Sequence, residues 1–105
     1  MAIALITTKE DRDSLTISFV ESKMTMHIST LLIKELEDTL STTKKNIYID
    51  MEAVDAIDSS IVGVLVRFHK KVKEQSRKLV FRNLTPTMVE LFKLTRMNTY
   101  LNIET

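Results

Sequence analysis

A strand-to-helix junction in the middle of the chain decides the fold, and it reads Val54-Asp55-Ala56-Ile57-Asp58-Ser59-Ser60-Ile61-Val62-Gly63-Val64-Leu65. An apolar strand ends just before this stretch, and an amphipathic helix begins inside it. Asp58, Ser59 and Ser60 stand where the helix begins. The first backbone N–H groups of a helix lack partners, and the helix dipole is positive there. We therefore expect Asp58 to cap the helix, at a position that would also suit a phosphate group.

The helix that follows, predicted over residues 59–76, has two distinct faces. At about 100° per residue, one face forms a core stripe. Its members are Ile61, Leu65, Phe68 and Val72. The other face carries an outer stripe of small and apolar side chains, which are Ser59, Val62, Gly63 and Val66. Gly63 costs about 1 kcal/mol in a helix relative to alanine. Two explanations stay open: another element approaches Gly63 closely from outside, or the helix packs tightly on its own neighbouring strand.

Hydrophobic periodicity predicts the remaining elements. The expected strands cover residues 3–8, 14–20, 47–51, 79–83 and 100–103. A helix over 29–41 is expected to start at a Ser29 or Thr30 cap, and another to start at Pro86 behind a Thr85 cap. Their predicted apolar residues are Leu31, Leu32, Leu36 and Leu40 in the first, and Val89, Leu91, Phe92 and Leu94 in the second. The order β-β-α-β-α-β-α-β predicts a single α/β domain over residues 1–105. Its sheet would be mixed and mostly parallel, with four to five strands, and would begin with an antiparallel hairpin.

Composition excludes several classes of function. The chain of 105 residues has no cysteine, which excludes disulfides, zinc–thiolate sites and thiol catalysis. It has one glycine, so the glycine-rich loops that cradle nucleotide phosphates are absent. We predict no cofactor and no metal. The short apolar start lacks a basic leader and soon meets charged residues, so we expect neither a signal peptide nor membrane insertion, and a cytoplasmic location.

Charge gives no sign of a nucleic-acid partner. The net charge is +1, because 14 acidic residues almost balance 15 basic ones. One basic run could suggest nucleic acid: Arg67, Lys70, Lys71, Lys73, Arg77, Lys78 and Arg82. It has no interleaved exposed aromatic residues, and a solvated helix surface explains it better.

Catalytic and metal sites are weakly supported. A hydrolase would need Ser59, His27 or His69, and Asp55 together. His69 lies about 15 Å further along the same helix, and the sequence does not place the loop that carries His27. Glu52, Asp55 and Asp58 could bind a hard cation, yet acidic residues at a helix N-terminus are stabilised by the dipole alone. Two methionines in a predicted polar loop over 21–26 are better candidates for partner contact, and these are Met24 and Met26. Met88 and Met97 are expected to fill the core.

Two segments together resemble a known family. They are Asp58-Ser59-Ser60-Ile61-Val62-Gly63 and Leu84-Thr85-Pro86, the latter followed by Leu91-Phe92-Lys93-Leu94-Thr95. With the predicted topology, they resemble the STAS domain of bacterial anti-sigma factor antagonists over nearly the whole chain. The family's glycine after the serine pair is replaced here by Ile61, and its acidic loop after the second strand by residues 21–24.

The resemblance implies a binding protein rather than an enzyme. Such antagonists bind an anti-sigma factor that is also a serine kinase, and they stop binding once they are phosphorylated. A PP2C-type phosphatase resets them. The family pattern implies Ser59 as the acceptor. The predicted partner-binding residues are Asp55, Asp58, Ser59, Ser60, Val62, Gly63, Val66, Met24 and Met26. An unphosphorylated docking subunit of a signalling scaffold or lipid-transport complex is the alternative.

Overall fold

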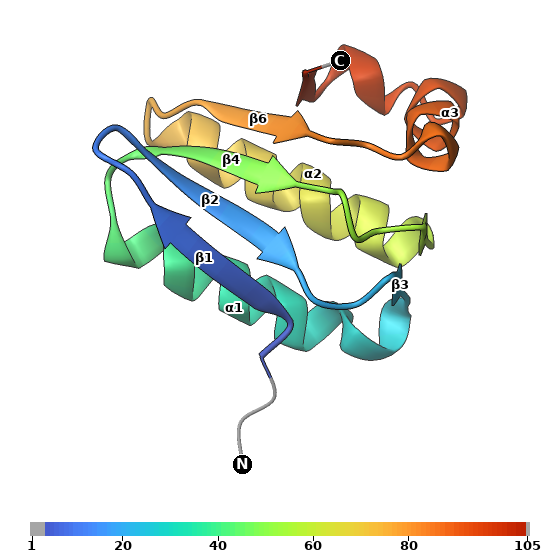
Figure 1. Cartoon of the computed structure of the whole chain (residues 1–105), viewed down its shortest axis with the longest axis horizontal. Coiled ribbons are helices and arrows are strands. Elements are labelled where there is room, and N and C mark those ends of the chain that lie inside the picture. Colours follow the sequence, from blue (N-terminus) through green and yellow to red (C-terminus); the bar gives the residue numbers. More distant parts are fainter. Residues whose placement is uncertain (1–3, 105) are drawn as a thin grey trace.

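A five-stranded mixed sheet, with helices α1 and α2 on one face, forms the centre of the molecule (Figure 1). The computed structural model describes residues 4–104. The strands follow the order β1 (Ile6–Glu10), β2 (Ser14–Phe19), β4 (Asn46–Asp50), β6 (Leu79–Arg82) and β7 (Asn102–Ile103). Only β1 and β2 are antiparallel, and every other neighbouring pair is parallel. The predicted fold class is confirmed, while the first strand begins later than predicted, and residue 3 lies outside the described residues.

Three α-helices and two 3-10 turns accompany this sheet within residues 4–104. They are α1 (Ser29–Thr42), α2 (Ser59–Glu74), α3 (Pro86–Leu94), η1 (Met26–Ile28) and η2 (Met97–Thr99). Within residues 4–104, no helix combines the length and the apolar character that a membrane crossing requires.

Side-chain alternation along the strands places the core on one face of the sheet. Leu15, Ile17 and Phe19 are buried, and the residues between them on β2 are half-buried, as the sequence predicts. Ile47 and Ile49 repeat this alternation on β4. These side chains join one hydrophobic cluster with the inner residues of α1 and α2. The sheet therefore supplies a rigid base on which α2 is fixed.

The inner stripe of α1 is narrower than predicted. Leu32, Leu36 and Leu40 are buried, but Leu31 is 42% exposed, so its assignment to the core was wrong. Leu31 precedes Leu32 by one position, about 100° around the helix, and therefore faces outward. The predicted cap was also wrong. Ser29 is the first helical residue, and its hydroxyl donates to the carbonyl of Met26 at 2.8 Å.

Helix α3 begins as predicted. The hydroxyl of Thr85 accepts a hydrogen bond from the Met88 N–H at 3.3 Å, and Pro86 occupies the first turn. Phe92 packs edge-on against Phe81 of β6, with ring centroids 6.1 Å apart. Leu94, however, is 80% exposed, so its prediction as a core residue was wrong. It stands two positions after Phe92, about 200° around the helix, and so lies on the opposite side.

The C-terminus of α2 is capped without a glycine. Ser76 adopts a left-handed conformation with φ 57°, and its N–H donates to the carbonyl of Lys73. The N–H of Arg77 donates to the carbonyl of Val72 at 3.2 Å. This pair of bonds is a Schellman motif. It ends the helix at Glu74, two residues earlier than predicted, and directs Arg77 toward the end of α1.

Candidate functional site

A second, two-stranded sheet brings another chain segment beside the N-terminus of α2. Strand β3 (Lys23–Met24) pairs in parallel with β5 (Ala56–Ile57). The N–H of Asp55 donates to the carbonyl of Ser22 at 2.7 Å, which extends this pairing by one residue. The prediction of a polar loop over residues 21–26 was therefore wrong in part. The pairing holds β3 and η1 against the strand-to-helix junction.

Asp58 caps α2, as the sequence predicts, and also fixes the neighbouring segment. Its Oδ1 accepts a hydrogen bond from the N–H of Ile61 at 3.1 Å, which satisfies one of the free donors of the first helical turn. Its Oδ2 accepts a second bond from the N–H of Met26 at 2.9 Å. One carboxylate thus joins the start of α2 to the start of η1.

Replacing Asp58 by alanine is expected to lower the free energy of unfolding by about 1.5 to 2 kcal/mol. Loss of an N-cap costs about 1 kcal/mol, and loss of a further hydrogen bond about 0.5 to 1 kcal/mol. Asp58→Asn is the matched control, because its carbonyl still caps Ile61 while its amide group cannot accept from Met26. Urea denaturation would give the energies. Amide hydrogen exchange should quicken at Met26 in both variants and at Ile61 only in Asp58→Ala. Equal stability of wild type and Asp58→Ala would contradict this role.

The two methionines predicted to contact a partner separate in the structure. Met24 is 1% exposed and belongs to the core, so its prediction as a surface contact was wrong. Its side chain turns inward because β3 pairs with β5, which the sequence did not indicate. Met26 is 64% exposed at the start of η1, a turn that packs against both α1 and α2.

The outer stripe of α2 is partly accessible to solvent. Ser59 and Gly63 are exposed, while Val62 and Val66 are half-buried against the edge of the core. Ser60 is half-buried and Asp55 is exposed. Ile61, in the place of the family's glycine, is completely buried and so leaves the surface around Ser59 uncovered.

Gly63 faces open space. A Cβ atom added to Gly63 would meet no atom within 4 Å among the described residues. Tight packing of α2 on its own neighbouring strand therefore does not explain this glycine.

Gly63→Ala is therefore expected to raise the free energy of unfolding by about 1 kcal/mol, because alanine is the better helix former and nothing opposes its methyl group. Thermal or urea denaturation would measure the change. A destabilised Gly63→Ala variant would contradict the open surface. Ser59→Ala, about one turn earlier on the same exposed face, serves as a control of similar size.

The acidic side chains that the sequence offers as a cation site do not form one in the described structure. No group of three or more His, Asp or Glu side chains within residues 4–104 is arranged to hold a metal ion. His69 instead lines a cleft near the C-terminal end of α2, with Tyr100 and Asn102. The site around Ser59 is thus an exposed hydroxyl on a small, partly apolar surface.

The fold and this site define a class of protein: a small α/β domain that presents a serine at the N-terminus of a helix packed on a mixed sheet. The STAS domain family model matches residues 6–105. The chain belongs to the STAS domain family.

Solved structures with the same fold share little sequence with this chain. A STAS domain protein of Planctomyces limnophilus, described as an anti-sigma-factor antagonist, superimposes with a TM-score of 0.84 at 21% identity, covering 99% of this chain and 92% of that one. The Bacillus cell fate determinant SpoIIAA in its phosphorylated form gives 0.68 at 16% identity, with 95% and 91% covered. A chain of the stressosome, described as a signal integration and transduction hub, gives 0.69 at 13% identity, with 92% and 85% covered.

Proposed function

We propose that this domain is a cytoplasmic, bacterial anti-sigma factor antagonist that acts by partner switching. In this proposal it binds an anti-sigma factor with serine kinase activity, and phosphorylation of Ser59 ends that binding. A PP2C-type phosphatase restores the active form. The role is regulation of transcription through binding, not catalysis. The observation that carries the proposal is the exposure of Ser59 directly after the Asp58 cap, on a surface shared with Gly63 and Met26.

The physical chemistry of this position favours a switch that leaves the fold intact. A phosphate on Ser59 would add a charge of about −1.5 to −2 at the positive end of α2, where free N–H groups and the dipole favour an anion. The same charge would lie on the outer stripe, four positions after the exposed Asp55. A partner seated there would have to desolvate it, which opposes binding.

Purified protein, the anti-sigma factor kinase of the same organism and ATP would test the proposal. Intact-mass and peptide analysis should find one added phosphoryl group, located on Ser59. Ser60→Ala is the matched control and should be modified like wild type, whereas Ser59→Ala should not. The modified protein should no longer co-elute with the kinase. A kinase that binds the domain firmly but modifies neither wild type nor Ser60→Ala would contradict the proposal.

The docking subunit is the second candidate, and the resemblance of the fold to a stressosome chain favours it. It predicts a stable complex with a large partner in the presence or absence of ATP. It also predicts that Ser59→Ala leaves that complex unchanged. The same co-elution experiment therefore separates the two functions.

A further inference from the structure

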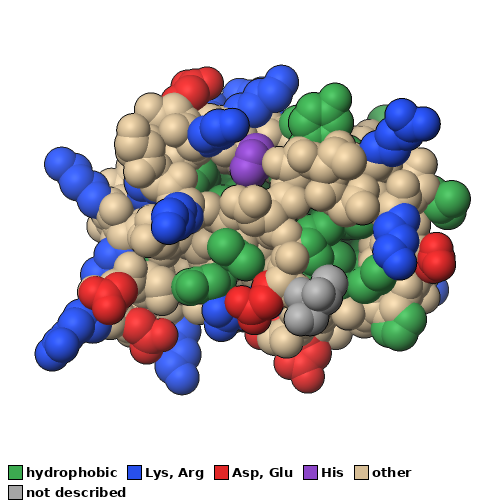
Figure 2. Space-filling view, turned by 90° about the horizontal axis from the view of Figure 1, so that it is seen from above, with side chains coloured by type: hydrophobic (Ala, Val, Ile, Leu, Met, Phe, Trp, Pro, Cys, Tyr) green, Lys and Arg blue, Asp and Glu red, His purple; other side chains and the backbone are tan. Residues whose placement is uncertain are grey.

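A basic cleft lies at the opposite end of α2 from Ser59. It has a volume of about 220 Å3 and is formed by the last turns of α2, the start of β6 and the segment that leads into β7. Four of its lining residues are basic and none is acidic; they are His69, Lys73, Arg77 and Lys78. Figure 2 views the molecule from above Figure 1 and shows Lys and Arg side chains next to a histidine on that face. We propose that this cleft binds a small phosphate-bearing anion.

Among residues 4–104, no carboxylate forms an ion pair with the basic side chains of the cleft. Other cations nearby have partners, since Lys71 lies 3.2 Å from Glu37 and Arg82 lies 3.7 Å from Glu104. Within residues 4–104, neither Lys73 nor Lys78 has a carboxylate within the 4.0 Å of an ion pair. Like charges that converge without a counter-charge raise the local potential and attract anions.

His69 is a partly buried member of this cleft. Burial, and secondly the charge of Lys73, lower the pKa of His69 below its ordinary value of 6.5. The Nδ1 atom of His69 and the Nη2 atom of Arg77 are also buried without a hydrogen-bond partner among the described residues. A bound anion would stabilise the protonated imidazole and would offset the repulsion from Lys73.

The shape of the cleft favours a small ligand over a polymer. Its volume is below the roughly 300 to 1,000 Å3 that is typical of sites for drug-sized molecules. Tyr100 is 67% exposed at the cleft, and its ring can lie against an organic group attached to the phosphate. A single tyrosine gives no series of stacking platforms such as a nucleic-acid strand requires.

Titration with orthophosphate, pyrophosphate and AMP, followed by amide chemical shifts, would test the site. We expect the shifts to concentrate at residues 69–79 and 100–102, and AMP to bind more tightly than orthophosphate if the tyrosine contributes. The double variant Lys73→Gln/Lys78→Gln should bind roughly tenfold more weakly, because each cation near 4 Å contributes severalfold even in water. The matched control Lys34→Gln/Lys93→Gln removes the same charge from exposed positions on α1 and α3 and should bind like wild type.

Three outcomes would overturn the proposal: unchanged binding by Lys73→Gln/Lys78→Gln, an equal loss in the control, or shifts located elsewhere. Binding of a single-stranded oligonucleotide through these lysines, without binding of the three small anions, would also overturn it.

A pH series with sulfate, whose charge is constant between about pH 5 and 8, adds an independent test. Within this range histidine titrates, whereas lysine, arginine and tyrosine ordinarily do not. The charged or titratable neighbours of His69 in the cleft are Lys73, Arg77, Lys78 and Tyr100. Sulfate should therefore bind more tightly as the pH falls below 6.5, the ordinary value for histidine, and His69→Asn should abolish this trend. A trend that persists in His69→Asn would contradict the part assigned to His69.

Discussion

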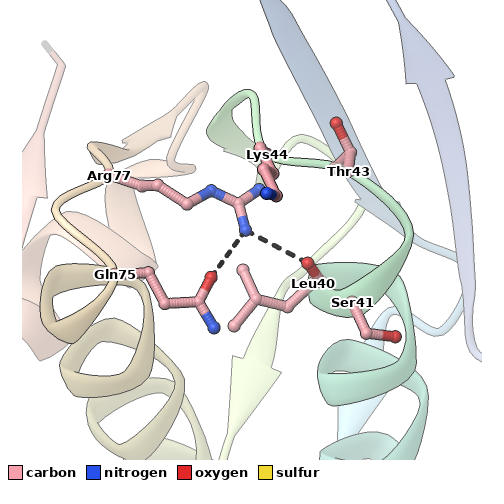
Figure 3. A pocket seen from close by; sticks show the side chains of 6 residues that line it. All are labelled: Leu40, Ser41, Thr43, Lys44, Gln75 and Arg77. Atoms are coloured by element: carbon pink, nitrogen blue, oxygen red, sulfur yellow. Dashed lines mark hydrogen bonds between the residues drawn. The ribbon is translucent and has the colours of Figure 1, made fainter.

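Arg77→Met is expected to lower the free energy of unfolding by about 2 to 3 kcal/mol, because one guanidinium group closes the ends of two helices. Its Nη1 donates to the carbonyl of Leu40 at 3.1 Å and to the side chain of Gln75 at 2.9 Å (Figure 3). Its Nε donates to the carbonyl of Lys45 at 2.8 Å. Hydrogen bonds that involve a charged group contribute about 1.5 to 3 kcal/mol each when they are well shielded, and partial exposure reduces this value.

The need for Arg77 follows from the composition of the chain. The last four carbonyl groups of a helix lack intrahelical partners, and a glycine beyond the helix commonly helps to satisfy them. The only glycine of this chain is inside α2, and α1 ends at Thr42 with an extended residue after it. Leu40 is among the last four residues of α1, so the arginine supplies the partner that local sequence does not.

Urea denaturation of Arg77→Met, Arg77→Lys and Gln75→Ala would measure this contribution. Arg77→Lys should be intermediate, since an ammonium group cannot reproduce the planar fork of donors. Gln75→Ala removes only the short-range bond and should change stability by less than about 0.5 kcal/mol. If Arg77→Met matched Gln75→Ala, the link between α1 and α2 would have no energetic importance.

The sequence predicts elements well where one periodic signal is long. Helix α2 has its apolar residues at helical spacing over four turns, and its core stripe and its Asp58 cap are both confirmed. The mixed sheet follows from the alternation of strands and helices, and the hairpin from the charged turn after β1. These features depend on neighbours in the chain, which local patterns can describe.

The errors arise where distant segments decide the outcome. Strands β3 and β5 have two residues each, too few for any periodicity, and they exist because they pair across 33 positions of sequence, as Lys23 does with Ala56. This pairing buries Met24 and brings Met26 to the second oxygen of Asp58. Likewise, Arg77 reaches carbonyls 32 and 37 positions away. The residue pattern of neither segment predicts these contacts.

The candidate site was therefore predictable in its helix and not in its surroundings. The exposure of Ser59 and Gly63 follows from their positions around α2, opposite the core stripe. The participation of η1 follows from the pairing of β3 with β5 and from the carboxylate of Asp58, whose second hydrogen bond fixes Met26 next to the helix. Because the same aspartate precedes the proposed acceptor serine, a new negative charge on Ser59 would arise beside the group that links the start of α2 to η1.

Ser59→Asp is expected to weaken binding to the anti-sigma factor kinase by at least about 100-fold while leaving the domain as stable as wild type or slightly more stable. A hundredfold loss corresponds to about 2.8 kcal/mol, within the cost of leaving a charge desolvated and unpaired in an interface. The acidic residue at the first position of α2 should meanwhile stabilise the helix by about 0.3 to 1 kcal/mol. Binding and folding therefore respond in opposite directions.

This opposition makes the experiment decisive when calorimetric binding and thermal unfolding are measured on the same samples. Ser59→Asn has nearly the same shape without the charge, and it should retain most of the binding. Thr87→Asp adds the same charge at an exposed position near the start of α3 and should bind like wild type. If Ser59→Asp bound as tightly as Ser59→Asn, charge at this position would not control the partner, and the docking role would be the better account of the surface. If Ser59→Asp unfolded at a clearly lower temperature, lost binding would reflect damage to the fold rather than a switch.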